Sequence, residues 1–407
     1  MAMFRIRSLV VPVLALVFVA FGVRAQAQGA PGVKTGIDVL EEQNFAPLKG
    51  LRIGLITNQT GMDSQGRRTI DVLAHAEGVK LVALFSPEHG IAGKLDQDRV
   101  DNSKDEATGL SIYSLYGAAR RPADEDLKGL DALVFDIQDA GVRFYTYTAT
   151  MGYCMEAAAK NHLQFFVLDR PNPLDGERVE GPMLDADKTA FVAYFPMPIV
   201  YGMTLGELAQ FFNAENKIGA DLHVVKMAGW RRSMAYGETG LAWIPPSPNL
   251  RTVGETLPYP GIEILQAGGV SVGRGTPTPF EVLGAPWIHG DGLAAELARR
   301  KIPGIAYVAA KFTPSTDLYK GQACEGVALT ITDPAAFDSV RNGLEVAEAL
   351  TKLYPEKFQT AKMIVLVGNA DTIAALQKAV PVNEIGESWT PALAAFRAVR
   401  AKYLIYE

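Results

Sequence analysis

The chain has 407 residues, of which 48% are hydrophobic and 21% are charged, and its formal net charge is −6. This composition is typical of a soluble globular protein with room for two domains, and it argues against a disordered or fibrous chain. The acidic balance argues against nucleic acid and against an anionic membrane surface as partners.

The first 27 residues, 1–27, are interpreted as a cleavable secretory signal. A basic start with Arg5 and Arg7 precedes the apolar run Leu9–Val23, and Ala25–Ala27 has the small-residue spacing of a cleavage site. The run is too short for a membrane span, and no later stretch is long and apolar enough to be one. Cleavage removes three arginines and no acid, so the mature net charge becomes −9. We therefore expect a periplasmic or secreted protein without membrane contact after cleavage.

Residues 28–250 alternate between helix and strand patterns, which predicts βαβ units and a parallel α/β sheet. Leu81–Phe85 has no polar residue and ends at Ser86-Pro87, as is typical of a strand buried on both faces. The polar stretch Gly90–Gly109 predicts a long loop over the strand ends. The predicted strands are Leu51–Thr57, Leu81–Phe85, Asp131–Asp136, Leu163–Leu168 and Leu222–Met227, and the predicted helices are Thr35–Asn44, Thr69–His75, Phe144–Lys160 and Thr204–Asn213.

Residues 251–407 are predicted to form a second, smaller α+β domain. The proline-rich run Ile244–Leu250 marks the boundary, because it can be neither a helix nor a central strand. The loop Val270–Phe280 contains glycines, prolines and an arginine, and this composition indicates a functional loop. A cleft between two such domains is a usual place for a ligand. The predicted helices are Leu293–Arg300, Ala335–Leu353 and Pro391–Lys402, and the predicted strands are Ile305–Phe312 and Gly326–Thr332.

Four successive predicted strands end in polar clusters, which are Thr57-Asn58, Ser86–His89, Asp136–Asp139 and Asp169–Asn172. The carboxyl ends of parallel strands meet at one edge of the sheet, where open α/β sheets bind their ligands. The same residue types also serve as turn and helix-cap residues, and Asp139 and Asn172 could be only that. The clusters hold more acids, arginines and histidine than capping requires, so we predict a site at this edge.

Motifs of several other chemistries are incomplete in this chain. Gly273–Thr276 resembles a fragment of a phosphate loop but lacks its full spacing, which argues against nucleotide binding. There is no Gly-x-Ser-x-Gly elbow and no His-Glu-x-x-His, and the five histidines are scattered, so neither an esterase elbow nor a metal site is expected. Two cysteines, Cys154 and Cys324, are too few for a disulfide framework. The sequence leaves open whether they form a disulfide bond with each other.

Carboxylates remain as candidates for the chemistry. Glu88 lies just after a buried strand and is predicted to be a general acid, because a carboxylic acid can protonate a leaving group. His89 could orient Glu88 or bind substrate, or it could be a turn residue only. Asp136, Asp139 and Asp169 are candidates for a second carboxylate, and Asp136 is taken as the catalytic one.

Arginines and tyrosines near the predicted edge could contact the substrate. Arg143, Arg170 and Arg274 could clamp an anionic group in bidentate fashion, although Arg170 could equally pair with a neighbouring aspartate. We expect Arg274 to help close the site, so that Arg274→Ala weakens binding with little loss of stability. Of Tyr145 and Tyr147, one is expected to contact a sugar and the other to pack in the core.

Several longer stretches resemble, in the same order, the NamZ family of exo-β-N-acetylmuramidases. They are Phe85–Gly90, Thr108–Gly117, Asp136–Tyr147, Leu168–Pro173, Pro246–Leu250 and Gly273–Thr276, followed by Pro279-Phe280 and Gly284–Trp287. The resemblance runs from about Lys49 to the C-terminus. It implies a Rossmann-like domain followed by a smaller domain with the site between them, no cofactor, and Glu88 as the glutamate of the family's Pro-Glu-His-Gly motif.

The resemblance also implies a glycoside hydrolase that removes terminal N-acetylmuramic acid from the non-reducing end of peptidoglycan fragments (MurNAc-GlcNAc). The lactyl carboxylate of that sugar suits an arginine clamp, and its 2-acetamido group permits substrate-assisted chemistry, so the second catalytic group stays open. The predicted substrate-binding residues are Asn58, Asp139, Arg143, Tyr145, Asp169, Arg170, Asn172, Asn249 and Arg274.

Two other functions compete with the hydrolase. A periplasmic binding protein for cell-wall fragments would use the same cleft, but such proteins usually have two similar lobes. An esterase or amidase acting on peptidoglycan is disfavoured by the missing nucleophile motif. The oligomeric state stays open.

Overall fold

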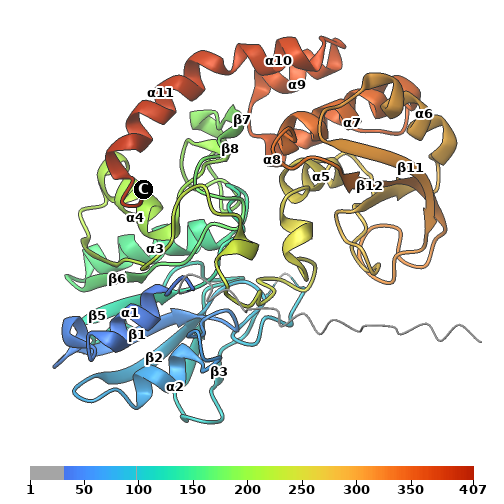
Figure 1. Cartoon of the computed structure of the whole chain (residues 1–407). Coiled ribbons are helices and arrows are strands. Elements are labelled where there is room, and N and C mark those ends of the chain that lie inside the picture. Colours follow the sequence, from blue (N-terminus) through green and yellow to red (C-terminus); the bar gives the residue numbers. More distant parts are fainter. Residues whose placement is uncertain (1–31, 98) are drawn as a thin grey trace, which may run out of the picture.

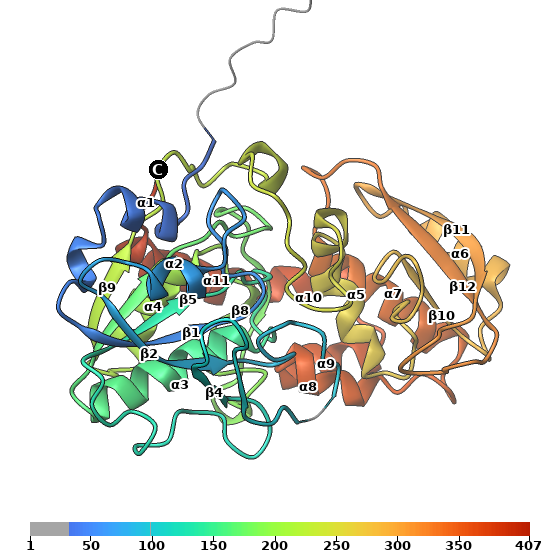
Figure 2. The same ribbon diagram turned by 90° about the horizontal axis from the view of Figure 1, so that it is seen from below.

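The structure is a computed structural model that describes residues 32–97 and 99–407, so the predicted signal, residues 1–27, lies outside it. The chain forms a larger α/β part around a seven-stranded sheet and a smaller α+β part around a three-stranded antiparallel sheet (Figure 1). Seen from below, the two parts lie side by side, and α5 (Tyr259–Gln266) is on the side of the smaller part that faces the large sheet (Figure 2). No helix in the described ranges is long and apolar enough to span a membrane.

The large sheet has the strand order β3-β4-β2-β1-β5-β6-β9 and is parallel except for β3. Its central strand β5 is buried at every position, as expected for a strand with helices on both faces. The parallel α/β fold predicted from the alternating pattern is therefore confirmed. The strands are β1 (Arg52–Thr57), β2 (Lys80–Ser86), β3 (Ser103–Lys104), β4 (Ser111–Ser114), β5 (Ala132–Asp136), β6 (Gln164–Leu168) and β9 (Asp221–Val225).

Alternate residues of the central strands pack on opposite faces of this sheet. Val134 of β5 belongs to the apolar cluster that contains α1 (Gly36–Glu42) and α2 (Thr69–Ala74). Its neighbour Phe135 belongs to the cluster that contains α3 (Tyr147–Lys160) and α4 (Leu205–Glu215). The sheet is therefore covered by two helices on each face, and its carboxyl edge is left for loops.

The smaller part is built on an antiparallel sheet in the order β10-β12-β11, next to the helices α5, α6 and α7. The hairpin of β7 and β8 lies before it in the chain. One apolar cluster contains residues of both parts, so they share a continuous core. The remaining bounds are β7 (Glu180–Met183), β8 (Pro198–Val200), β10 (Val282–Ala285), α6 (Gly290–Arg300), β11 (Ile305–Phe312), β12 (Cys324–Ile331) and α7 (Ser339–Leu353).

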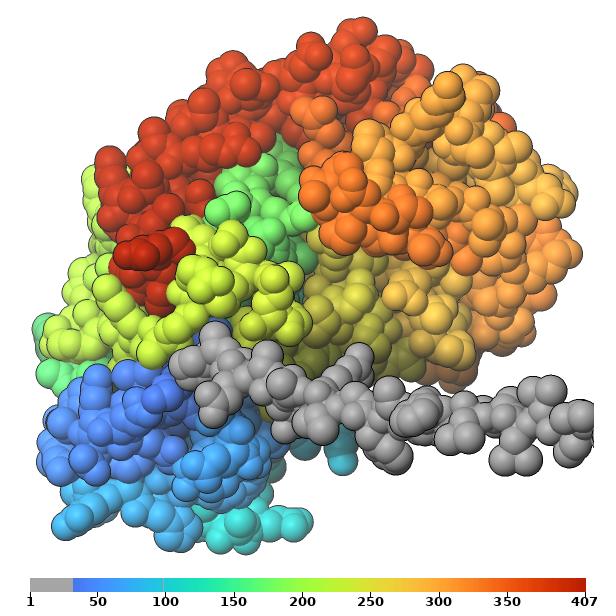
Figure 3. Space-filling model, viewed as in Figure 1, coloured from blue at the N-terminus to red at the C-terminus, as the bar shows by residue number. Residues whose placement is uncertain are grey.

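The end of the chain returns to the larger part. After α8 (Ile364–Val367), the helices α9 (Ala370–Gln377), α10 (Val382–Ser388) and α11 (Thr390–Arg400) form a band across the top of the molecule in the view of Figure 3. The Tyr406 hydroxyl donates to Asp169 Oδ2 at 2.6 Å. The Ile405 backbone N–H donates to Glu207 Oε1 at 2.9 Å. The last residues of the chain thus complete the larger part.

Both cysteines are buried and free, so the bridge that the sequence left open does not form in this structure. Cys154 lies in α3 with no exposed surface, within the core that covers the large sheet. Burial raises the pKa of both thiols above the usual value. A raised thiol pKa keeps the thiolate fraction small, so both side chains behave as small apolar residues.

Gly261 permits α5 and α7 to approach each other closely. A Cβ atom on Gly261 would lie 1.7 Å from the Ser339 carbonyl oxygen. We expect Gly261→Ala to lower the free energy of unfolding by about 1–3 kcal/mol through overpacking, measured by denaturant unfolding. Gly292→Ala in α6 is the matched control, because a Cβ there meets nothing within 4 Å. Equal stability of the two variants would contradict the assigned close approach.

Candidate active site

A cavity of about 160 Å³ lies between the two parts, beside the carboxyl edge of β2. Larger hollows occur on both parts, such as one of about 350 Å³ beside Arg341 and Glu345 on the smaller part and one of about 270 Å³ beside Arg170 and Tyr236 on the larger part, but Glu88 lines neither of them. Strand-end loops of the large sheet and α5 of the smaller part contribute to the lining. The cavity is lined by Glu88, His89, Asp96, Phe144, Tyr145, Thr146, Val192, Ser247, Tyr259, Glu263, Arg274, Phe280 and Leu366.

Glu88 is held at this cavity by its position after β2 and by one hydroxyl group. β2 ends at Ser86, and Glu88 is half-buried in the turn that follows. The Thr146 hydroxyl, just before α3, donates to Glu88 Oε2 at 2.5 Å. No ion pair of Glu88 occurs among the residues that the structure describes. One carboxyl oxygen is therefore fixed, and the carboxyl group has no cation partner there.

His89 is a turn residue that also lines the cavity, and a part in orienting Glu88 or binding substrate stays a prediction. Its backbone has φ = 68°, in the left-handed region, which marks a turn residue. Its Nδ1 lies 2.7 Å from the Leu95 carbonyl oxygen. Because a carbonyl oxygen only accepts, Nδ1 carries the hydrogen, and Nε2 of the neutral ring is left as an acceptor. His89 also lines the cavity, so its ring is both anchored in the turn and next to Glu88 in the lining.

The smaller part contributes a buried ion pair to the cavity. Arg274 Nη2 donates to Glu263 Oε1 at 2.7 Å, and burial raises the pKa of Glu263. Asp96 also lines the cavity, and its Oδ2 accepts a hydrogen bond of 3.2 Å from Asn249 Nδ2. Arg274 thus lies at the cavity as predicted from its glycine-flanked loop, and the predicted Asn249 reaches it through Asp96.

Tyr145 and Tyr259 supply aromatic walls. Their rings are 6.1 Å apart between centroids in an edge-to-face arrangement. Tyr147 does not line the cavity. Its hydroxyl donates to the Pro246 carbonyl oxygen at 2.6 Å. One tyrosine of the predicted pair therefore faces the cavity and the other packs inside.

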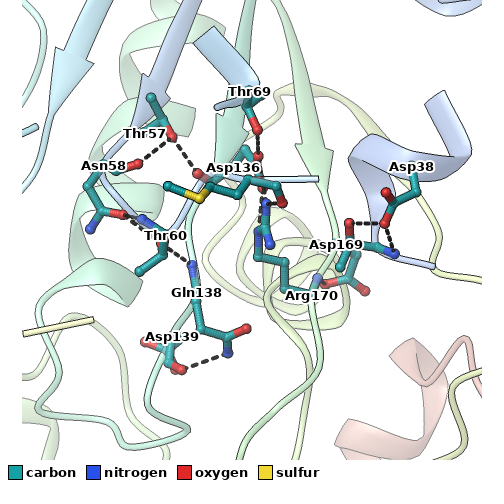
Figure 4. A network of polar contacts seen from close by, with 12 residues as sticks. Asp38, Thr57, Asn58, Thr60, Thr69, Asp136, Gln138, Asp139, Asp169 and Arg170 are labelled. Carbon is teal, nitrogen blue, oxygen red and sulfur yellow. Dashed lines mark hydrogen bonds and ion pairs between the residues drawn. The ribbon is translucent and has the colours of Figure 1, made fainter. Parts of the chain in front are cut away.

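The structure places Asp136 and Arg170 in a buried network at the ends of β1, β5 and β6, away from the cavity lining (Figure 4). Arg170 Nε donates to Asp136 Oδ1 at 2.6 Å, and Arg170 Nη2 donates to Asp136 Oδ2 at 2.9 Å. The Thr69 hydroxyl also donates to Asp136 Oδ2, at 2.5 Å. Both carboxylate oxygens of Asp136 thus accept hydrogen bonds from protein groups, and the residue is 0% exposed to solvent. We therefore assign this pair to the support of the strand ends rather than to substrate.

Asn58, Asn172 and Asp169 also have internal partners outside the cavity lining. Asn58 Oδ1 accepts from the Thr60 backbone N–H at 2.9 Å. Asn172 Nδ2 donates to a backbone carbonyl oxygen at 2.9 Å. Asp169 accepts from the Thr204 hydroxyl at 2.7 Å at the start of α4, where Thr204 is the N-cap. The turn and cap roles that the sequence left open account for these three side chains.

Asp139 and Arg143 are buried beside the cavity residues without lining the cavity. Asp139 Oδ2 accepts from the Gly141 backbone N–H at 2.7 Å and from the Tyr201 hydroxyl, and burial raises the pKa of Asp139 to about 6. Arg143 donates to the backbone carbonyl oxygens of Pro182, Met197, Leu366 and Val367. Burial lowers the pKa of Arg143 to about 9. Arg143 thus joins the two parts through main-chain contacts and holds no carboxylate.

Glu263 and Asp96 are cavity residues that the sequence analysis did not single out. Glu263 belongs to α5, which was not predicted because Pro258, Pro260 and Gly261 look like helix breakers. A single charged residue in the otherwise apolar run Tyr259–Leu265 was the available signal. Asp96 lies in the predicted loop Gly90–Gly109, whose length and acidity marked the loop but no single residue.

The cavity suits a sugar ring with an acetal bond to break. Phe144, Val192 and Leu366 contribute apolar surface to the lining, and Tyr145 and Tyr259 contribute aromatic rings. Glu88 offers a carboxyl group for proton transfer. No cluster of three or more histidine, cysteine, aspartate or glutamate side chains that could hold a metal ion occurs in residues 32–97 and 99–407.

Comparisons with known proteins agree with this architecture. The model for the N-terminal part of exo-β-N-acetylmuramidase NamZ matches residues 53–254, and the model for its C-terminal part matches residues 257–406. The peptidoglycan β-N-acetylmuramidase NamZ of Bacillus subtilis is 44% identical over 385 residues, which cover 94% of this chain and 93% of the relative.

Two solved structures of DUF1343 family proteins from Bacteroides fragilis have the same fold. One has a TM-score of 0.86 at 39% identity, and the other has a TM-score of 0.77 at 30% identity. Each comparison covers 92% of this chain and 99% of the other. The family resemblance in the sequence motifs is thereby confirmed. The chain belongs to the NamZ family of exo-β-N-acetylmuramidases and is a glycoside hydrolase.

Proposed function

We propose that this enzyme removes terminal N-acetylmuramic acid from the non-reducing end of peptidoglycan fragments, with Glu88 as the general acid. The name of the Bacillus subtilis relative supports peptidoglycan as the substrate class. The observation that carries the proposal is the carboxyl group of Glu88, which lines the cavity between the two parts and contacts Thr146 rather than a cation.

The contact with Thr146 suits proton donation to a glycosidic oxygen. Thr146 holds Glu88 Oε2, so Oε1 is the oxygen that can carry the proton toward the substrate. Breaking an acetal requires a proton on the departing oxygen in the transition state, and a fixed carboxylic acid provides it at low entropic cost. Thr146 therefore acts as a positioning residue for the acid.

The enzyme is proposed to act outside the cytoplasm, after cleavage of residues 1–27. The basic start, the apolar run and the small residues at Ala25–Ala27 support this location. Peptidoglycan lies outside the cytoplasmic membrane, so the location fits the substrate. N-terminal sequencing of the protein from the periplasmic or culture fraction is expected to begin just after Ala27, and recovery of an uncleaved chain in the cytoplasm would contradict it.

The function is tested by the products of a defined disaccharide. We expect MurNAc-GlcNAc to be split into its two sugars and a chromogenic β-N-acetylmuraminide to release its phenol, because the proposed activity cleaves the bond at the reducing side of a terminal N-acetylmuramic acid. A GlcNAc-MurNAc fragment, with glucosamine at the non-reducing end, is the control and is expected to stay intact. Binding of the muramic-acid sugars without any turnover would favour the binding-protein alternative.

A further inference from the structure

The three arginines that could hold an anionic group differ sharply in how their donors are used. Arg143 donates to four backbone carbonyl oxygens, and Arg170 donates to the buried carboxylate of Asp136. Arg274 lines the cavity. The structure thus reduces three candidates to one, because of these three arginines only Arg274 lines the cavity that contains Glu88.

Most of the donors of Arg274 are unused. A guanidinium has five N–H donors, and the hydrogen bond of Arg274 in the described ranges joins Nη2 to Glu263 Oε1. Its Nε has no hydrogen bond but forms an ion pair with Asp317, at 3.7 Å from Oδ2. The guanidinium carbon is 5.5 Å from the centroid of the Phe280 ring. Glu263, Asp317 and Phe280 therefore hold the group in place, and N–H donors without a hydrogen bond remain for a ligand.

The charges of the residues that line the cavity favour binding of an anionic group next to Arg274. The cavity has three acids, Glu88, Asp96 and Glu263. Of the described residues that line it, Arg274 has the one permanent positive charge, since His89 is positive only when protonated. An anionic substrate group would be repelled near the acids and attracted near Arg274. A planar carboxylate matches two parallel N–H donors of a guanidinium.

We propose that Arg274 binds the lactyl carboxylate of the terminal N-acetylmuramic acid and so sets the preference for this sugar over N-acetylglucosamine, which lacks the lactyl group. The inference rests on the proposed function for its substrate class. Glu263 is the positioning residue that orients the guanidinium from α5. The specificity of the enzyme is therefore supplied by the smaller part, while the proton donor comes from the larger part.

The ion pair with Glu263 changes the sequence-based expectation that Arg274→Ala costs little stability. Removing the arginine alone leaves the Glu263 carboxylate buried without a cation, which destabilises the fold. The test therefore uses Arg274→Met alone and together with Glu263→Gln, where no lone buried charge remains. Arg251→Met is the matched control, because Arg251 donates to the Thr276 carbonyl oxygen next to the same loop but does not line the cavity.

The experiment compares nitrophenyl β-N-acetylmuraminide with the methyl ester of its lactyl carboxylate, which has the same shape but no charge. We expect the wild type to prefer the charged substrate in kcat/KM by about 10- to 100-fold, the usual range for a hydrogen bond to a charged group. The preference is expected to vanish in Arg274→Met and in the double variant through loss on the charged substrate, with kcat/KM for the ester nearly unchanged. Arg251→Met is expected to keep the preference.

Two results would overturn the inference. One is a folded Arg274 variant that keeps the wild-type preference, and the other is an equal loss on both substrates, which would make the role structural only. If the wild type turned over neither substrate, the proposed function would fail instead. Calorimetric binding of free N-acetylmuramic acid and its methyl ester would then still test Arg274 by the same comparison.

Discussion

Glu88→Gln is expected to lower kcat on MurNAc-GlcNAc by about 10²–10⁴-fold, the usual contribution of a general acid. Glutamine keeps the shape of the side chain and can still contact the Thr146 hydroxyl, so the melting temperature and substrate binding are expected to stay close to wild type. The measurement is steady-state kinetics together with thermal unfolding on the same preparation.

Comparing substrates with different leaving groups distinguishes proton donation by Glu88 from other roles of this residue. A nitrophenolate departs without full protonation, so nitrophenyl β-N-acetylmuraminide is expected to lose much less rate than the disaccharide. Glu106→Gln is the matched control, because Glu106 is exposed in the loop after Glu88 and does not line the cavity. Equal losses on the two substrates would contradict the acid role, and a lower melting temperature with an unchanged rate would indicate a structural role.

Arg170→Met is expected to lower the free energy of unfolding by about 3–5 kcal/mol, because it leaves the Asp136 carboxylate buried without a cation. Arg170 is 7% exposed and Asp136 is 0% exposed, so water cannot take the place of the lost partner. Denaturant unfolding measures the effect. Adding Asp136→Asn to the same chain removes the lone charge and is expected to recover part of the loss.

The control for this pair is an ion pair at the surface. The side chains of Arg99 and Asp101 are 71% and 78% exposed, and such pairs contribute about 0–1 kcal/mol. Arg99→Met is therefore expected to leave stability nearly unchanged. A small effect of Arg170→Met, similar to that of Arg99→Met, would show that the buried pair does not support the strand ends.

The large sheet was predictable because its strands are short apolar runs between helix patterns. Leu81–Phe85 and Asp131–Asp136 became β2 and β5 with small shifts at their ends. The strand β4, with only four residues and two serines, has no such signal. The helix α5 was not predicted because Pro260 and Gly261 look like helix breakers. In the structure Pro260 lies in the first turn, where proline is tolerated, and Gly261 is required by close packing on α7.

The candidate site was predictable only in part, for a physical reason. The rule that ligands bind at the carboxyl ends of parallel strands indicates where polar clusters meet. It does not indicate which of their side chains point into a cavity. Buried turns at the same edge need hydrogen-bond partners, and Asp136, Asp169 and Asn172 supply them. Glu88 and Arg274 lie on the cavity lining, and their assigned roles stay predictions until the variants are measured.

The docking of the last residues has a consequence for biosynthesis. Asp169 follows β6, in the middle of the chain, yet one of its partners is Tyr406, next to the C-terminal residue. Translation proceeds from the N-terminus, so this carboxylate is synthesised well before its partner, which lies 237 residues further along the chain. We expect the nascent larger part to reach its full stability only after Tyr406 has left the ribosome, so that it stays incompletely folded while the smaller part is being made.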